Sequence, residues 1–338
     1  MAARFGAAIS ILLLVSSAWA MENEVTKLLM PGAEVAEPET YLCTAMEVDK
    51  LHNHYITEFK THGSMKMAHH ILLYGCSEPG SDQKIWNCGE MEGGGSDGFY
   101  EQAPTCAAGP QIIYAWGRDA PPLKLPKDVG FAVGGDSAVR YLVVQVHYMM
   151  PTEEPDHSGV EMISTTNKMP KTAATLLMVT GGELPAKSAE NFETACVIDE
   201  DVELHPFAFR VHAHKHGKVV SGWKVSGGEN EDEDKWELIG KEDPMKPQMF
   251  YPVKNTDMTI SPGDVVAARC YMENDEDRDV AVGATGKDEM CNFYMMYWVE
   301  GDNVLDDNTC YSPGPPEYYW KTEGGLTNIP SDKEANEL

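Results

Sequence analysis

The sequence predicts an all-β protein built from two tandem, jelly-roll-like antiparallel β-sandwiches. Short runs rich in β-branched and aromatic residues, such as 71–74, 141–148, 218–225 and 265–270, alternate with clusters of Gly, Pro, Asn and Asp. No long apolar pattern follows the 3.6-residue period of a helix. Four of the eight cysteines precede residue 110 and four follow residue 195, which indicates two halves that are cross-linked separately.

The chain divides into five predicted segments. Residues 1–20 combine a basic start, a short apolar run and a small-x-small ending at Ala20, the pattern of a secretory signal peptide. The boundary between the sandwiches is placed within 167–172, where Lys168, Pro170 and Lys171 interrupt the strands. The remaining segments are a polar leader at 21–38, the N-terminal sandwich at 39–170, the C-terminal sandwich at 171–321 and a flexible tail at 322–338.

Cysteine content and charge limit the compartment and the partners. The eight cysteines all follow the signal peptide and predict four disulfides in an oxidising compartment, although the sequence alone leaves their pairing open. The net charge of −28 argues against nucleic acid as a partner, because phosphates would be repelled. No stretch is long and apolar enough for a transmembrane helix. We therefore expect a protein of the secretory pathway, held in the granule lumen or secreted.

Donor side chains recur at alternate positions in three strand-like segments. They are Arg210, His212 and His214 in the first, Met290, Asn292 and Tyr294 in the second, and Gln145 and His147 in the third. A strand turns alternate side chains to opposite faces, so each set should lie on one face. Two imidazoles with a thioether suit copper, and an arginine beside neutral donors suits a carboxylate substrate.

Met290 is one of 19 methionines, and a methionine is ordinarily core filler. Its alternate neighbours Asn292 and Tyr294 are polar, which a core face would not favour. Cys291 and Phe293 would point the other way, into the sandwich. This pattern favours a strand that lines a cleft.

His69 and His70 are adjacent, so on a regular strand their rings would face opposite ways. Joint metal binding by both rings therefore needs a strand end or a bulge. A single histidine in a sheet is ordinarily just a polar residue with hydrogen-bond partners, so spacing alone does not assign this pair a function.

With these positions in view, the chain resembles the peptidylglycine α-hydroxylating monooxygenases, ascorbate-dependent copper enzymes that begin the C-terminal amidation of peptides. The resemblance covers about residues 38–312. Its motifs in chain order are ETYLC at 39–43, HHILLYGC at 69–76, YAWGR at 114–118, VQVHY at 144–148, RVHAH at 210–214, GKVVSG at 217–222, PGDVVAARC at 262–270 and DEMCN at 288–292. So many matches in the same order indicate membership of the family rather than chance.

The resemblance implies two copper sites, one in each sandwich, that face each other across a cleft. The electron-transfer copper would be bound by His69, His70 and His147, and the O2-activating copper by His212, His214 and Met290. Ascorbate would reduce both coppers, and O2 would be the co-substrate. Tyr41 and Gln145 are expected beside the first site without binding its metal.

The implied substrate is a peptide that ends in glycine, which would be hydroxylated at Cα. Its carboxylate would be held by Arg210, Asn292 and Tyr294, and we expect Tyr294, His212, His214 and Met290 to take part in catalysis. The resemblance further implies the disulfides Cys43–Cys88, Cys76–Cys106, Cys196–Cys310 and Cys270–Cys291.

Two departures from the family pattern carry expectations of their own. Many members have a disulfide from the leader to the first domain, but here no cysteine precedes Cys43, and His157 stands where the second partner is expected. We therefore expect the leader to be less firmly held. Bifunctional relatives also carry a downstream lyase domain, whereas this chain ends at Leu338. We expect a monofunctional enzyme that relies on a separate lyase for the second amidation step.

Two alternative functions remain open at this level. Dopamine-type β-monooxygenases share the copper ligands but hydroxylate phenethylamines, which offer no carboxylate for Arg210 to hold. A non-catalytic, copper-binding secreted protein would need neither a carboxylate clamp nor a second copper site. Arg210 and the spacing of Asn292 and Tyr294 favour the peptidyl enzyme.

Overall fold

The computed structural model describes residues 23–63, 68, 70–89, 99–117, 120–227, 233–283 and 287–338. The predicted signal peptide and His69 lie outside these residues. Nearly all secondary structure in the described ranges is β-strand, and the only helix found there is α1 (Asp332–Asn336). The prediction of an all-β fold is confirmed. Within the same ranges, no helix has the length and apolar character needed to span a bilayer.

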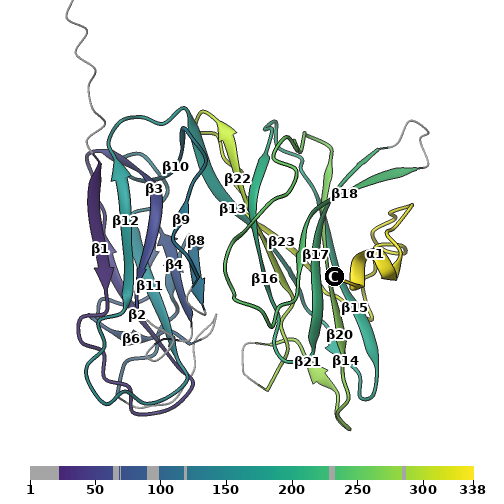
Figure 1. Cartoon of the computed structure of the whole chain (residues 1–338), viewed down its shortest axis with the longest axis horizontal. Coiled ribbons are helices and arrows are strands. Elements are labelled where there is room, and N and C mark those ends of the chain that lie inside the picture. Colours follow the sequence, from purple (N-terminus) through teal and green to yellow (C-terminus); the bar gives the residue numbers. More distant parts are fainter. Residues whose placement is uncertain are drawn as a thin grey trace, which may run out of the picture.

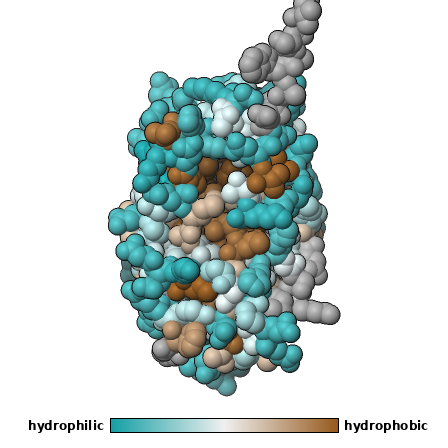
Figure 2. All heavy atoms as spheres, turned by 90° about the vertical axis from the view of Figure 1, so that its left-hand side faces the viewer, coloured by the Kyte–Doolittle hydropathy of each residue, from teal (hydrophilic) through white to brown (hydrophobic). Residues whose placement is uncertain are grey.

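Two sheets form the N-terminal half (Figure 1). The sheet nearer the C-terminal half runs β6-β2-β11-β4-β8, with β2 (Thr40–Glu47), β4 (His70–Cys76), β6 (Trp86–Asn87), β8 (Gln111–Gly117) and β11 (Tyr141–Tyr148). The other runs β1-β12-β3-β10, with β1 (Glu24–Leu29), β3 (Asn53–His62), β10 (Val129–Gly134) and β12 (Gly159–Thr165), and β9 (Leu123–Lys124) pairs with β3. A separate pair is formed by β5 (Glu78–Pro79) and β7 (Cys106–Ala108). The face turned away from the C-terminal half has a hydrophilic rim around central apolar side chains (Figure 2).

The C-terminal half is also a sandwich of two sheets. Its inner sheet, facing the N-terminal half in Figure 1, contains β13 (Lys171–Thr180), β22 (Asn292–Glu300), β16 (His205–His212), β19 (Tyr251–Pro252) and β23 (Thr309–Ser312). Its outer sheet runs β15 (Ala189–Val197), β20 (Val265–Glu273), β17 (Gly217–Gly227) and β18 (Asp234–Glu242). A further pair is formed by β14 (Glu183–Leu184) and β21 (Val280–Ala281).

The two halves meet at β10 and β13, which pair in parallel over two residues and so join their sheets into one. Beyond that junction, β22 is covered on both faces. Phe293 and Met295 pack into the core of the C-terminal half, whereas Tyr294 and Met296 pack into the core of the N-terminal half. The alternation follows the period of two expected of a strand, and it makes one side of β22 the wall between the halves.

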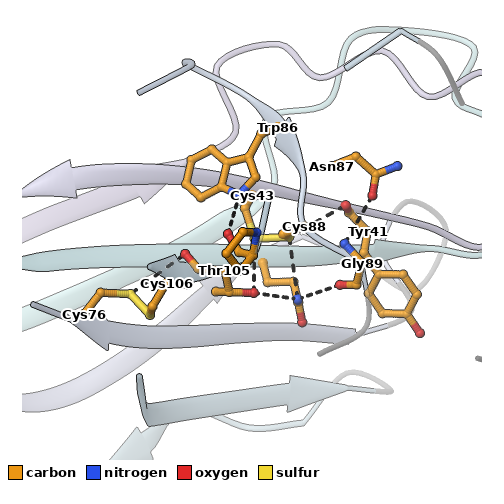
Figure 3. Close-up of a disulfide and its surroundings, with 11 residues drawn as sticks. Tyr41, Cys43, Cys76, Trp86, Asn87, Cys88, Gly89, Thr105 and Cys106 are labelled. Atoms are coloured by element: carbon orange, nitrogen blue, oxygen red, sulfur yellow. Dashed lines mark hydrogen bonds between the residues drawn. A yellow bond between two sulfur atoms is a disulfide. The ribbon is translucent and has the colours of Figure 1, made fainter. Parts of the chain in front are cut away.

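Four disulfides cross-link the halves separately, two in each. They are the pairs that the family resemblance implies: Cys43–Cys88, Cys76–Cys106, Cys196–Cys310 and Cys270–Cys291. Figure 3 shows the first two close together beside Thr105 and Trp86. Such disulfides persist in oxidising compartments, which fits a protein of the secretory pathway.

The leader is more firmly held than expected. β1 pairs with β12 along its whole length, from Glu24 opposite Ser164 to Leu29 opposite Gly159. Beyond β1, the ring of His157 lies with Nδ1 3.1 Å from the carbonyl oxygen of Met30. Main-chain hydrogen bonds therefore anchor the leader, in which no cysteine precedes Cys43.

The expectation of a flexible tail at 322–338 is wrong, because this segment packs on the outer sheet of the C-terminal half. Trp320, just before it, is fully buried, and Ala335 of α1 belongs to the same apolar cluster. Ser331 and Glu334 form a capping box at the start of α1. Thr327 and Asp234 exchange hydrogen bonds that fix the intervening chain to β18. The buried Trp320 provides the apolar contact that holds this segment on the sheet, and the polar composition of residues 322–338 did not predict it.

Candidate metal centres

β16 and β22 bring the two donor sets of the C-terminal half together. The strands are antiparallel neighbours, with Arg210 opposite Tyr294 and His212 opposite Asn292. Side chains directly opposite each other on adjacent strands share a face and lie close. Arg210, His212, Asn292 and Tyr294 therefore lie on one face, on the side of the sheet where Tyr294 packs into the core of the N-terminal half.

His214 and Met290 lie two residues outside the strands, which corrects the prediction that each donor set sits on a regular strand. The carboxylate of Glu289 holds both loop segments in place. It accepts the backbone N–H groups of His214, Met290 and His216, the last two at 2.9 Å. Glu289 is fully buried, so these charge-assisted hydrogen bonds fix where the donors at 214 and 290 can point.

Hydrogen bonds also determine which ring nitrogen of each histidine carries the proton. His212 Nδ1 lies 3.0 Å from Gln248 Oε1, and His214 Nδ1 lies 2.8 Å from the carbonyl oxygen of Asp288. Arg210, which has only donors, also lies 2.9 Å from Gln248 Oε1 and so fixes the orientation of that amide. Both histidines therefore donate from Nδ1, and Nε2 is the unprotonated nitrogen, as a metal ligand requires.

The electrostatic surroundings keep His212 neutral. Burial holds the pKa of His212 well below its usual range, and the nearby Arg210 and His214 lower it further. His147 of the N-terminal half acts more weakly on the His212 pKa in the same direction.

The donors at this site fit copper. The rings of His212 and His214 meet at a steep angle with centroids 5.4 Å apart, and Met290 is buried beside their loops. Two neutral imidazoles and a thioether are donors that favour Cu(I) and that hard cations avoid. No cluster of three or more His, Cys, Asp or Glu side chains in the described ranges has the geometry of a metal site. That statement does not cover a site that includes the Met290 thioether, because methionine is not one of those residue types, nor one that includes His69, which lies outside the described residues.

Arg210 is a buried cation without a balancing carboxylate. Its side chain is 2% exposed, and no carboxylate in the described part of the chain lies within ion-pair distance of it. Within the described residues, its one hydrogen bond to a side chain goes to the neutral Gln248, and its Nε has no hydrogen-bond partner. Burying an uncompensated guanidinium costs free energy, so this arrangement points to an anionic ligand that completes it.

Tyr294 and Asn292 border the Arg210 guanidinium. The guanidinium carbon lies over the Tyr294 ring, 4.7 Å from its centroid, and Asn292 Nδ2 donates to the Tyr294 hydroxyl over 3.2 Å. Tyr294 also lines a cavity of about 240 Å³ between the two halves, together with Leu177 and Tyr74. The three expected clamp residues are thus contiguous at the interface.

In the N-terminal half, β4 begins at His70 and lies beside β11, with His70 opposite His147. Their Nδ1 atoms are 3.4 Å apart. Two imidazole nitrogens bound to one ion at about 2.0–2.1 Å and near-tetrahedral angles are separated by about the same distance. His69 itself lies outside the described residues.

Two further contacts orient the His147 ring. Tyr41 stacks on its face, with ring centroids 4.0 Å apart and planes 3° from parallel. Glu39 Oε2 lies 2.9 Å from His147 Nε2. A carboxylate accepts, so Nε2 carries the proton and Nδ1 is the unprotonated nitrogen turned toward His70. Tyr41 therefore lies beside the rings of His147 and His70.

Gln145 serves the disulfide region rather than the histidines. It is fully buried on β11, and its amide nitrogen donates to Gly89 O at 3.0 Å and to Thr105 Oγ1 at 3.3 Å. Figure 3 shows these acceptors next to the Cys43–Cys88 disulfide. None of its hydrogen bonds in the described ranges reaches a histidine ring.

Sequence reasoning missed three residues that contact the candidate donors. Glu289 directly precedes Met290 in the sequence, and this adjacency is the signal that could have found it. Glu39 lies within a motif that the resemblance already uses. Gln248 gives no signal in the sequence, since it reaches Arg210 and His212 from a loop 36 or more residues away.

Comparison with known proteins gives consistent matches along the chain. The family model described as copper type II ascorbate-dependent monooxygenase, N-terminal domain, matches residues 26–155. The model for the C-terminal domain of the same family matches residues 171–323.

Relatives with curated functions fall into two groups. Peptidyl-glycine alpha-amidating monooxygenase A of Xenopus laevis is 38% identical over 308 residues, covering 89% of this chain and 31% of that protein. The Rattus norvegicus peptidylglycine alpha-amidating monooxygenase is 37% identical, covering 89% and 29%. Human dopamine beta-hydroxylase is 27% identical, covering 84% and 47%. The chain thus spans about a third of the length of the amidating relatives.

Proposed function

Because the chain belongs to the copper type II ascorbate-dependent monooxygenase family, we propose that it hydroxylates the Cα of a C-terminal glycine in peptides. This is an oxidoreductase activity that uses O2 and ascorbate, and it is the first step of C-terminal amidation. The amidating relatives, at 36–38% identity, support this substrate over that of the dopamine beta-hydroxylases, at 24–27%.

The buried guanidinium of Arg210 carries the proposal. A peptide carboxylate would supply the negative charge that no described side chain provides there, and would accept from Arg210 in the two-pronged geometry that guanidinium favours. Asn292 and Tyr294, both on β22, would also bind this carboxylate. An amine substrate would leave the guanidinium uncompensated.

The donors at His212, His214 and Met290 would hold the copper that activates O2. Copper supplies the redox chemistry that no side chain can, because the Cα–H bond of glycine is unactivated. One oxygen atom of O2 enters that bond and the other leaves as water, with two electrons taken from ascorbate and two protons from solvent. Arg210 lies one strand repeat from His212, so a carboxylate held there would bring the glycine Cα close to the metal.

The histidines of the N-terminal half would hold a second copper for electron transfer. His70 and His147, together with His69, form the proposed ligand set, with Tyr41 stacked on the His147 ring. In this division the N-terminal sandwich at 39–170 transfers electrons, and the C-terminal sandwich at 171–321 binds substrate and carries out hydroxylation. We further propose that the protein acts in the granule lumen or after secretion, and that a separate lyase completes amidation.

One experiment tests the proposed reaction. The purified protein is incubated with copper, ascorbate, O2 and a glycine-extended peptide, and the product is analysed by mass spectrometry. We expect one added oxygen on the terminal glycine, and no addition to the same peptide made with a C-terminal amide in place of the carboxylate. Turnover of phenethylamine with no change to the peptide would overturn the proposal in favour of the dopamine-type reaction.

A further inference from the structure

We propose that Glu39 is a positioning residue for the electron-transfer copper, acting through the imidazole of His147. This inference rests on the proposed role of His147 as a copper ligand. Glu39 directly precedes β2 and is not one of the proposed copper ligands.

The first observation is the contact between the two side chains. Glu39 Oε2 lies 2.9 Å from His147 Nε2, while the Glu39 side chain is 63% exposed and that of His147 only 6%. An ion pair or hydrogen bond to so exposed a carboxylate contributes little to folding. The contact nevertheless fixes the proton on Nε2 and leaves Nδ1 as the nitrogen that faces His70.

The second observation is the backbone of Glu39, which has a φ of +55°. Glu39 follows Pro38, and in a turn of this kind the position after proline is normally Gly or Asn, which tolerate positive φ. In the described ranges only Asp128, Lys187 and Asn328 share this feature among residues other than glycine. Glycine would adopt this φ without steric cost, so the backbone conformation does not explain the glutamate side chain at this position.

The third observation is the second restraint on the same ring. Tyr41 lies two residues after Glu39 and stacks on His147 with its plane 3° from parallel. The stacked ring restrains tilting of the imidazole, and the carboxylate restrains its rotation in the plane. Together they aim Nδ1 at His70 Nδ1, 3.4 Å away. Ligating histidines commonly donate their second ring N–H to a carboxylate, which orients the ring and strengthens it as a donor.

Three variants separate the roles of the side chain and of the backbone. Glu39→Gly removes the carboxylate and relieves the backbone, so we expect an unchanged or higher Tm in the metal-free protein together with a Cu(II) dissociation constant raised about 10- to 100-fold at one of two sites. Glu39→Gln keeps an acceptor for Nε2–H and should give an intermediate loss. Glu37→Gln is the matched control, because it removes the same charge from an exposed position in the same turn.

Copper binding is measured by competition with a chelator of known affinity, and the potential of the affected site by redox titration. If the carboxylate favours Cu(II) over Cu(I), Glu39→Gly loses more affinity for Cu(II) than for Cu(I), and the reduction potential of that site rises. The rise is about 59 mV for each factor of ten by which the loss of Cu(II) affinity exceeds the loss of Cu(I) affinity. The Glu37→Gln protein should bind copper as the unmodified protein does.

The outcomes distinguish this inference from the proposed function. Two copper ions bound normally by Glu39→Gly, with an unchanged potential, would overturn the role of Glu39 while leaving the copper sites intact. A His147→Ala protein that binds as much copper as the unmodified chain would instead overturn the assignment of His147 as a ligand, and the proposed function with it. A lower Tm in Glu39→Gly would also count against the inference, because it would make the glutamate a structural residue.

Discussion

Arg210 and His212 donate to the same oxygen atom, Oε1 of Gln248, over 2.9 and 3.0 Å. A single amide therefore connects the residue proposed to hold the substrate carboxylate with a residue proposed to bind copper. Because Oε1 accepts both hydrogen bonds, a change at Gln248 acts on the two functions at once.

Replacing Gln248 with leucine tests this connection. Gln248→Leu has a similar size but accepts no hydrogen bond, so His212 loses the contact that fixes its tautomer, and Arg210 loses its only side-chain hydrogen bond in the described ranges. We expect copper affinity at one site to fall about 10- to 100-fold and KM for a glycine-extended peptide to rise in the same protein. Copper titration and steady-state kinetics measure the two effects. A change in only one of them would contradict the shared role.

Substitution of Arg210 should separate stability from activity. Arg210→Met removes a buried cation that has no carboxylate partner, so we expect the Tm of the ligand-free protein to stay level or rise. Loss of hydrogen bonds to a charged substrate group should lower kcat/KM for the peptide by about 10- to 150-fold. Arg210→Lys keeps the charge but not the planar guanidinium, so its kcat/KM should lie between those of Arg210→Met and the unmodified protein. A marked loss of Tm would identify Arg210 as a structural residue instead.

Met290→Ile replaces the thioether with a hydrocarbon of similar volume. We expect the fold to survive, with a cost below about 1.5 kcal/mol, because the site is buried but the change conserves size. Hydroxylation should be nearly abolished, since the proposed O2-activating copper loses its soft ligand. Circular dichroism, Tm and peptide turnover provide the measurements. Normal turnover by this variant would remove Met290 from the ligand set.

Glu289→Gln should loosen both loops that carry ligands. The carboxylate accepts three backbone N–H groups in a buried position, and an amide offers only one acceptor atom for them. We expect the free energy of unfolding to fall by about 2–3 kcal/mol, and the amides of His214 and Met290 to exchange hydrogen faster. Asp288→Asn makes the same change of charge at the neighbouring residue and serves as the control. Equal exchange rates in the two variants would contradict the anchoring role.

The pH dependence of stability follows from His212. In the folded protein, burial and the nearby Arg210 lower the pKa of His212, whereas in the unfolded chain histidine titrates near about 6.5. As the pH falls below about 6.5, the unfolded chain takes up a proton that folded His212 does not, so the free energy of unfolding decreases until the pH reaches the folded pKa.

Urea unfolding of metal-free protein at several pH values between about 7.5 and about 5 tests this effect. His212→Gln has no proton to gain, so its stability should decline less steeply over the same range. Parallel pH profiles for the two proteins would show that His212 does not account for the loss.

The local features of the site were predictable, but its assembly was not. The period of two along 210–214 and 290–294 correctly grouped Arg210 with His212 and Asn292 with Tyr294, because strand geometry is set by the backbone alone. That β16 and β22 are neighbours depends on sheet order, which no local pattern encodes. The resemblance to the family supplied the link between the two halves, which spacing could not.

Two errors have identifiable physical causes. His214 and Met290 continue the alternation of the strands without belonging to them, and their backbone N–H groups donate to the Glu289 carboxylate. The segment 322–338 was judged from its polar composition, although Trp320 immediately before it and the Ser331-x-x-Glu334 capping box both indicated order. Whether a polar terminal segment is ordered depends on buried contacts between residues far apart in the chain, such as the contact of Arg269 with the Trp320 ring.

The docked C-terminal segment also sets practical limits on handling this protein. Arg269 is buried between Glu193 and the Trp320 ring, so a chain shortened to before Trp320 would lose the indole that covers this ion pair and the main-chain N–H that Glu193 accepts. Such a chain should express poorly or aggregate. A purification tag should therefore follow Leu338 rather than replace the segment from Trp320 onward. In Figure 1, α1 lies on the outer side of the C-terminal half, away from the interface that carries the candidate sites.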